Sequence, residues 1–205
     1  MKPVPMLCSL VLFSCLLPAQ GAFAQAAPGS YAATISAHIK KYVETHEVVK
    51  GDDRRHLRFF APDSTYRVTA TFERSSDAVG FGMMTSGRSV QEYFRYGTLR
   101  FAVNGAEQRL TIYQSKQLMH NEAYKNYLFI PFTDATTGKE SYDGGRYLDL
   151  SIPDIREGKV LLDFNKAYNP YCCYVAGYQC PIPPKENALP VAIRAGEMNY
   201  GKPGH

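Results

Sequence analysis

Apolar and polar residues follow two different periods along the chain, and the first of them is helical. Between Ser30 and Lys50 the apolar positions recur every three or four residues. They are Ile35, Ile39, Tyr42 or Val43, and Val48-Val49. This spacing is typical of an amphipathic helix. Ser30 is a residue type that caps helix starts, and Gly51 is one that ends helices. The pattern therefore predicts one helix over this stretch.

After Arg58 the period changes to two. From Tyr66 to Glu73 apolar and polar residues alternate strictly, as in a half-buried strand. Further strands are expected at Val79–Thr85, Glu92–Tyr96, Leu99–Val103, Gln108–Gln114, Asn126–Phe132, Tyr147–Leu150, Lys159–Phe164 and Leu189–Ala195. Asn104-Gly105 lies between two of them and suits a tight hairpin turn. The fold class predicted is mainly β, an antiparallel sandwich or open barrel with one N-terminal amphipathic helix.

The first residues have the three parts of a secretory signal peptide. A lone positive charge at Lys2 precedes an apolar run from Met6 to Leu17, and a small-residue stretch closes on Ala22-Phe23-Ala24. This is the A-x-A pattern at which such leaders are cleaved. We expect cleavage near Ala24-Gln25.

Three segments follow from these patterns: a signal peptide over residues 1–24, a helix and linker over 25–56, and a β-rich domain over 57–205. An alternative is a lipoprotein acylated at Cys15. The bulky Phe13 and the apolar run that continues past the cysteine argue against it. The protein is therefore expected to be periplasmic or secreted.

Charge and hydropathy argue against a nucleic-acid partner and against a transmembrane segment. The formal net charge is +4 and falls to +3 when Lys2 leaves with the leader. Basic residues occur in ones and twos, as at Lys40-Lys41, and form no stripe that could follow phosphates. After the leader, the longest apolar run is Tyr127–Phe132, far below the about 20 residues of a membrane helix. We expect neither a nucleic-acid partner nor a transmembrane segment.

The segment from Asn165 to Asn187 has no periodicity and holds every cysteine that follows the leader: Cys172, Cys173 and Cys180. In an oxidising compartment, a disulfide across this short loop is more in keeping with the spacing than a metal site. It would stabilise the fold by about 2.5 kcal/mol on the chain-entropy model. Three cysteines leave one thiol over, either free or available to a partner. No metal and no cofactor are predicted.

Polar residues that could carry chemistry lie in the C-terminal half. Arg146 follows two glycines and could bind a carboxylate or phosphate, or it could pair inside the fold with Asp134, Asp163 or Glu197. Asp163 and Glu197 each end a predicted strand, so neighbouring strands could bring the two carboxylates together. Asn165 and Asn187 could line the same pocket or simply satisfy loop backbone.

Several long strings carry a family resemblance. They are Tyr66–Ala70, Tyr127–Asp134, Gly144–Asp149, Asp163–Cys172, Cys180–Pro184, Leu189–Ile193 and Ala195–Glu197. From about Leu57 to Glu197 the chain resembles the bacterial family catalogued as domain of unknown function 1684. The resemblance implies no activity, because the family is uncharacterised.

It does mark positions. The family pattern falls on Arg146, Asp163, Asn165, Cys172, Cys180, Asn187 and Glu197. Cys173 stands where the family usually has alanine. The resemblance therefore implies a Cys172–Cys180 disulfide and leaves Cys173 as the odd thiol.

The function hypothesis that we favour from the sequence is a ligand-binding or scaffold module of the cell envelope. Its partner would be an unknown small molecule or an envelope component. The pocket would lie around Arg146, Asp163 and Glu197, with the Cys172–Cys180 loop as its rim. The alternatives are a hydrolase that uses Asp163 and Glu197 or a cysteine thiol, and a metal-binding protein.

Overall fold

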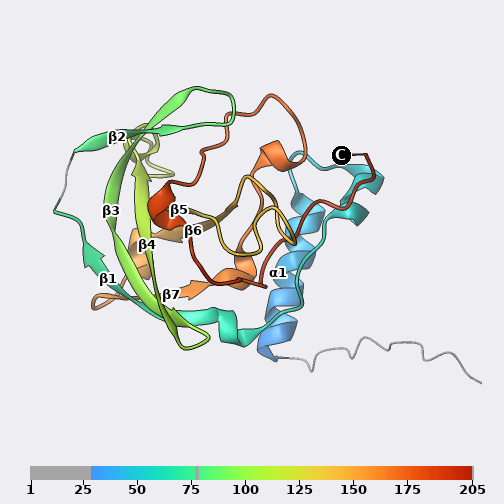
Figure 1. Ribbon diagram of the computed structural model, residues 1–205, viewed down its shortest axis with the longest axis horizontal. Coiled ribbons are helices and arrows are strands. Elements are labelled where there is room, and N and C mark those ends of the chain that lie inside the picture. Colours follow the sequence, from blue (N-terminus) through green and yellow to red (C-terminus); the bar gives the residue numbers. More distant parts are fainter. Residues whose placement is uncertain (1–28, 77–78, 205) are drawn as a thin grey trace, which may run out of the picture.

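The computed structural model describes residues 29–76 and 79–204. The predicted signal peptide, its cleavage site and Cys15 lie outside the described residues. The chain forms an antiparallel sheet that curls into a half-barrel, with one main helix beside it (Figure 1). The prediction of a mainly β fold with an N-terminal helix is confirmed, and the sheet takes the open-barrel form.

The sheet has seven strands in the order β6-β5-β4-β3-β1-β7, and β2 also pairs with β3. The helix α1 spans Tyr31–Thr45, and the strands are β1 Arg67–Arg74, β2 Gly80–Met84, β3 Val90–Val103, β4 Ala106–Ser115, β5 Tyr127–Phe132, β6 Arg146–Ser151 and β7 Lys159–Asp163. Every pairing between these strands is antiparallel. The strands β6 and β7 are therefore the two edges of the curled sheet.

Strand β3 is one long element where the sequence predicted two. Its first half pairs with β2 and its second half with β1, so both neighbours share one edge of β3. The register with β4 shifts between Arg95 and Gly97, and such a bulge bends a strand. At Gly97 a Cβ atom would lie only 2.5 Å from the Glu73 carbonyl oxygen. Glycine lets the strand bend there without breaking.

The turn between β3 and β4 confirms the hairpin prediction. Asn104 has φ 51° and Gly105 has φ 76°, the two positive values that a tight hairpin with this twist requires. The pairing continues to the residues that flank the turn, Val103 and Ala106.

Helix α1 begins as predicted and ends earlier than predicted. The amide of Ala33 donates to the Ser30 side-chain oxygen at 3.1 Å, which caps the start. The helix ends at Thr45, because His46 leaves helical geometry and its Nδ1 accepts the Val49 amide at 2.9 Å. That bond turns the chain and buries Val49. The prediction that the helix extends to Gly51 was wrong.

The main core lies on the face of the sheet that carries Leu99, Leu110, Ile130 and Leu162. The segment Leu189–Ala195 contributes buried side chains to it, but no strand forms there as the alternation predicted. Two of its carbonyls, from Ile193 and Ala195, accept hydrogen bonds from the Arg146 guanidinium instead of from a neighbouring strand. The buried Arg146 guanidinium thus supplies hydrogen bonds that a neighbouring strand would otherwise donate to this segment.

Candidate functional site

A large cleft runs beside the two edges of the sheet. Its volume is about 1130 Å³, slightly above the roughly 300–1,000 Å³ of most small-molecule sites. Residues of β6, β7 and α1 line it together with the segment from Tyr168 to Pro181. The curl of the sheet thus leaves a concave space that the helix and this segment partly enclose.

Aromatic rings form one wall of the cleft. They are Tyr93, Tyr127, Phe129, Tyr147 and Tyr168. Along β5, Tyr127 and Phe129 alternate with Leu128 and Ile130, which belong to the main core, because successive side chains of a strand point to opposite faces. The rings of Phe129 and Tyr147 meet edge to face with centroids 4.7 Å apart. The rings make a continuous wall on the side of the sheet away from the core.

Asp149 places a carboxylate in this aromatic wall. It lies on β6 directly opposite Phe129. Its Oδ1 accepts hydrogen bonds from the Tyr127 hydroxyl at 2.7 Å and the Tyr168 hydroxyl at 2.8 Å. Solvent reaches Asp149 through the cleft, while protein surrounds its other sides. This burial raises the pKa of Asp149, and the two tyrosine hydroxyls oppose the rise.

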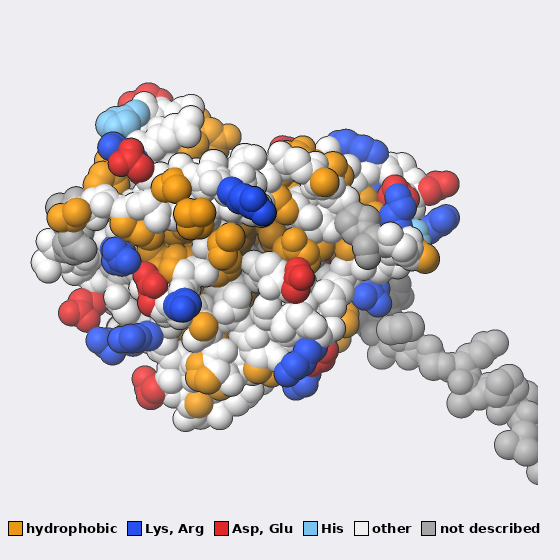
Figure 2. All heavy atoms as spheres, turned by 45° about the horizontal axis from the view of Figure 1, so that its top comes forward, with side chains coloured by type: hydrophobic (Ala, Val, Ile, Leu, Met, Phe, Trp, Pro, Cys, Tyr) orange, Lys and Arg blue, Asp and Glu red, His pale blue; other side chains and the backbone are white. Residues whose placement is uncertain are grey.

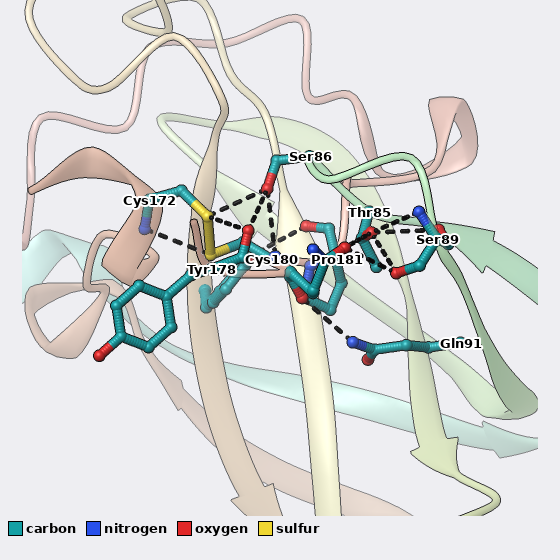
Figure 3. Close-up of a disulfide and its surroundings, with 10 residues drawn as sticks. Thr85, Ser86, Ser89, Gln91, Cys172, Tyr178, Cys180 and Pro181 are labelled. Atoms are coloured by element: carbon teal, nitrogen blue, oxygen red, sulfur yellow. Dashed lines mark hydrogen bonds between the residues drawn. A yellow bond between two sulfur atoms is a disulfide. The ribbon is translucent and has the colours of Figure 1, made fainter. Parts of the chain in front are cut away.

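The disulfide loop forms the rim of the cleft. Cys172 and Cys180 are joined by a disulfide, as the resemblance implied. The Ser86 amide donates to the Cys180 carbonyl at 2.9 Å, and the Ser86 hydroxyl accepts from the Cys180 amide at 3.2 Å (Figure 3). The Tyr147 hydroxyl donates to the Pro181 carbonyl at 2.5 Å. The loop is thus held between the β2–β3 turn and the aromatic wall.

The surface next to this rim is apolar. Figure 2 shows hydrophobic side chains gathered across the middle of the face that comes forward from the top of Figure 1. The β2–β3 turn and the disulfide segment contribute exposed apolar side chains, namely Met84, Val90, Tyr178 and Ile182. Tyr178 also lines the cleft, so the apolar lining continues onto the surface.

The other end of the cleft lies against helix α1 and the residues that follow it. The Tyr171 hydroxyl donates to Glu47 Oε2 at 2.6 Å. His46 is buried, and burial together with the nearby Lys50 and Arg54 charges lowers its pKa. Its Nε2 has no hydrogen-bond partner among the residues that the structure describes. A neutral imidazole fits this environment.

Arg146, a predicted pocket residue, lies fully buried in the fold. Its guanidinium donates to Asp134 Oδ2 at 2.7 Å and to the carbonyls of Ile193 and Ala195 at 2.8 and 2.5 Å. Both side chains of the ion pair are 0% exposed. This is the internal pairing that the sequence left open as an alternative. The hydrogen bonds of Arg146 described above all join parts of the fold. A role of Arg146 and Asp134 in ligand binding stays a prediction.

Glu197 is also fully buried. Its Oε1 accepts from the Tyr174 hydroxyl at 2.5 Å, and its Oε2 accepts from the Asn169 amide at 2.9 Å and the Tyr42 hydroxyl at 3.2 Å. Burial raises the pKa of Glu197 to about 7, although these donors and Arg146 pull it down. Tyr42 connects it to the cleft, which Glu197 itself does not line.

The two predicted asparagines join backbone segments. Asn187 accepts from the Thr111 amide at 2.8 Å and donates to the carbonyls of Thr111 at 2.9 Å and Pro131 at 2.8 Å. It thereby bridges β4 and β5, which pair directly only at Tyr113 and Phe129. Asn165 accepts from the Asp63 amide and donates to its carbonyl. Both side chains are buried.

Asp163 is the predicted pocket residue that lines the cleft. It ends β7 as expected and accepts the Tyr31 hydroxyl of α1 at 2.7 Å. Within the part of the chain that the structure describes, Asp163 and Glu197 share no hydrogen-bond partner, but each accepts a hydrogen bond from a tyrosine of α1. The two carboxylates therefore anchor different ends of the helix.

The thiol outside the disulfide and the arrangement of possible metal ligands bear on the enzyme and metal hypotheses. Cys173 is free and buried, and burial, with a smaller effect of Glu197, raises its pKa to about 12. It is absent from the cleft lining. Within residues 29–76 and 79–204, no group of three or more His, Cys, Asp or Glu side chains could hold a metal ion.

Sequence reasoning missed Asp149, Tyr127 and Tyr168 as a group. Asp149 and Tyr127 lie in strings that carry the family resemblance, and Asp149 also follows the alternation of Tyr147-Leu148. That alternation could have placed Asp149 on the same face as Tyr147. It could not show that Tyr168, from a loop, meets the same carboxylate.

Comparisons with known proteins agree with this fold. The model of a family described as protein of unknown function (DUF1684) matches residues 53–198. The solution NMR structure of an uncharacterized protein from Haloarcula marismortui is 33% identical, with a TM-score of 0.61, and the match covers 81% of this chain and 92% of that chain. No curated protein matches the chain. No helix among the described residues is long and apolar enough to cross a membrane.

Proposed function

The chain belongs to the family of proteins of unknown function DUF1684, and on that premise we propose that it is a ligand-binding module of the cell envelope. The site is the cleft between the sheet edges and α1. The observation that carries the proposal is a cleft of about 1130 Å³ with an aromatic wall and one carboxylate within that wall. Apolar lining with a few placed polar groups is the usual composition of a small-molecule site.

The residues that line the cleft support binding more than catalysis. Glu197 and the free thiol of Cys173, which the hydrolase hypothesis would use, do not line the cleft. The raised pKa of Cys173, about 12, keeps it as a thiol, and the thiolate is the nucleophilic form. Asp163 alone of the residues suggested for hydrolysis reaches the cleft.

The disulfide supports the envelope part of the proposal. Disulfides form and persist outside the reducing cytosol, and Cys172–Cys180 closes the rim of the cleft. The proposal includes the signal peptide over residues 1–24. Its test is the intact mass of protein expressed with its own N-terminus: a mature chain that begins near Gln25 supports it, and an uncleaved chain in the cytoplasmic fraction contradicts it.

The binding proposal is tested by ligand-observed NMR with a library of small aromatic, aliphatic, sugar and amine fragments. Tyr127→Ala removes one ring of the wall, and Tyr124→Ala is the matched control, since Tyr124 is 49% exposed and does not line the cleft. We expect fragments that bind the unaltered protein and Y124A but lose binding to Y127A. Fragments that bind all three proteins equally, or a library without hits, would overturn the proposal.

A further inference from the structure

The Asp149 carboxylate lacks a countercharge. Its Oδ1 is occupied by the hydroxyls of Tyr127 and Tyr168. In the part of the chain that the structure describes, nothing donates to its Oδ2, and no Lys, Arg or His nitrogen lies within 4.0 Å of it. Phenol hydroxyls are neutral and solvate the charge without cancelling it. The carboxylate is exposed toward the cleft, so a ligand there can reach the free Oδ2.

Two cationic side chains, Arg156 and Lys166, line the cleft and are the candidates for balancing the Asp149 charge. Among the ion pairs of the described residues, neither side chain pairs with Asp149. The Arg156 backbone is tied to Lys159 through paired hydrogen bonds at 2.9 and 2.8 Å. The negative charge in the aromatic wall is therefore not neutralised by either side chain.

The rings around Asp149 favour a positive ligand as well. Tyr127 and Tyr168, whose hydroxyls donate to Asp149, are half-buried and line the cleft, and the buried rings of Tyr93, Phe129 and Tyr147 pack behind them. The faces of aromatic rings carry partial negative charge and attract cations that lie over them. A carboxylate beside two half-buried aromatic rings is complementary to a cation with an apolar body.

We propose that the cleft takes a small organic cation, a protonated amine with an apolar body, whose N–H group donates to Asp149 Oδ2 while the body packs on the aromatic wall. This inference rests on the proposed function. An anionic ligand would be repelled by the Asp149 carboxylate, and a neutral hydroxyl would leave the negative charge of the carboxylate uncompensated. An N–H is required because the free acceptor is a carboxylate oxygen, which a quaternary ammonium group does not hydrogen-bond.

The test uses three probes with one phenyl body and different head groups: phenethylammonium, phenethyl alcohol and 3-phenylpropionate. Affinities are measured by NMR titration at pH 7.5 and low salt. We expect phenethylammonium to bind about tenfold or more tightly than the alcohol, since a desolvated cation–π contact with a charged hydrogen bond is worth at least one factor of ten. Asp149→Asn should remove that advantage and leave the alcohol affinity unchanged.

Glu122→Gln is the control, because Glu122 is an exposed carboxylate that does not line the cleft. E122Q should keep the ammonium preference. If D149N does not fold, Asp149→Ser removes the same charge with a smaller side chain. Equal affinity for ammonium and alcohol, tighter binding of the carboxylate, or an ammonium preference that survives D149N would overturn the inference while the binding function stands. Failure of all three probes overturns the inference, and only a fragment library without cleft ligands overturns the binding function too.

Discussion

Replacing Glu197 with glutamine should stabilise the protein at alkaline pH and change little at acidic pH. The Asp134–Arg146 ion pair already balances the buried guanidinium. An ionised Glu197 therefore adds a second negative charge to the interior. Burial raises its pKa from the ordinary 4.5 to about 7. Between these two pH values, the folded protein keeps a proton on Glu197 that the unfolded chain has released.

The sign and size of the effect follow from proton linkage. Between pH 4.5, the ordinary pKa, and about pH 7, the folded state binds more protons than the unfolded state, so the free energy of unfolding falls as pH rises. The contribution of Glu197 is fully present below pH 4.5 and lost above pH 7. One pKa unit corresponds to about 1.4 kcal/mol, which makes the loss about 3 kcal/mol in total.

Glutamine imitates the protonated acid. Its Oε1 can accept the Asn169 amide, and its amide group can donate to the Tyr174 hydroxyl, the two groups nearest the carboxylate. We expect E197Q to match the unaltered protein at pH 5 within about 1 kcal/mol. At pH 8 it should be more stable by about 2–3 kcal/mol.

Urea unfolding at pH 5, 6.5 and 8 measures this difference. Other titrating groups contribute to both proteins and cancel in the comparison. Glu107→Gln is the control, because Glu107 is exposed on β4, and it should give a difference that does not change with pH. If E197Q is destabilised by the same amount at pH 5 and pH 8, Glu197 is ionised in the folded protein and the reasoning is refuted.

Other substitutions test the buried polar contacts and the disulfide. Asp134→Ala leaves the Arg146 guanidinium buried without its carboxylate and should cost about 3–5 kcal/mol in urea unfolding; a loss below 1 kcal/mol would mean that the pair is not formed. Asn187→Ala should cost about 2–4 kcal/mol and speed amide exchange where β4 and β5 separate, and unchanged exchange there would contradict the bridging role. The double variant C172S/C180S should lose about 2.5 kcal/mol, and dithiothreitol should bring the unaltered protein to the same stability; a reductant without effect would show that the disulfide contributes nothing.

Short-range patterns in the sequence determined most of the elements. Alternation located β1 because one face of that strand is buried against the core, and side-chain direction follows the strand period. Asn104-Gly105 determined the β3–β4 turn because few residues accept two positive φ values in succession. The cysteine spacing and the family resemblance together anticipated the Cys172–Cys180 disulfide.

Two errors in the prediction occurred where a side chain satisfied backbone groups, a distant side chain in one case and a local one in the other. Leu189–Ala195 alternates like a strand, but the Arg146 guanidinium takes two of its carbonyls. The helix was predicted to reach Gly51, but the His46 imidazole turns the chain after Thr45. In both cases the local pattern was correct about burial and wrong about hydrogen-bond partners.

Most of the candidate site was decided only by the tertiary structure, although Asp163 and the disulfide loop at the rim were named from the sequence. The sequence marked Arg146, Asn187 and Glu197, and their observed contacts hold segments of the fold together. The cleft is lined instead by residues such as Asp149 and Tyr168. These two meet because β6 and a loop that follows β7 come to the same side of the curled sheet. A sequence pattern records which face a residue takes, but the distance between two segments depends on how the whole sheet bends.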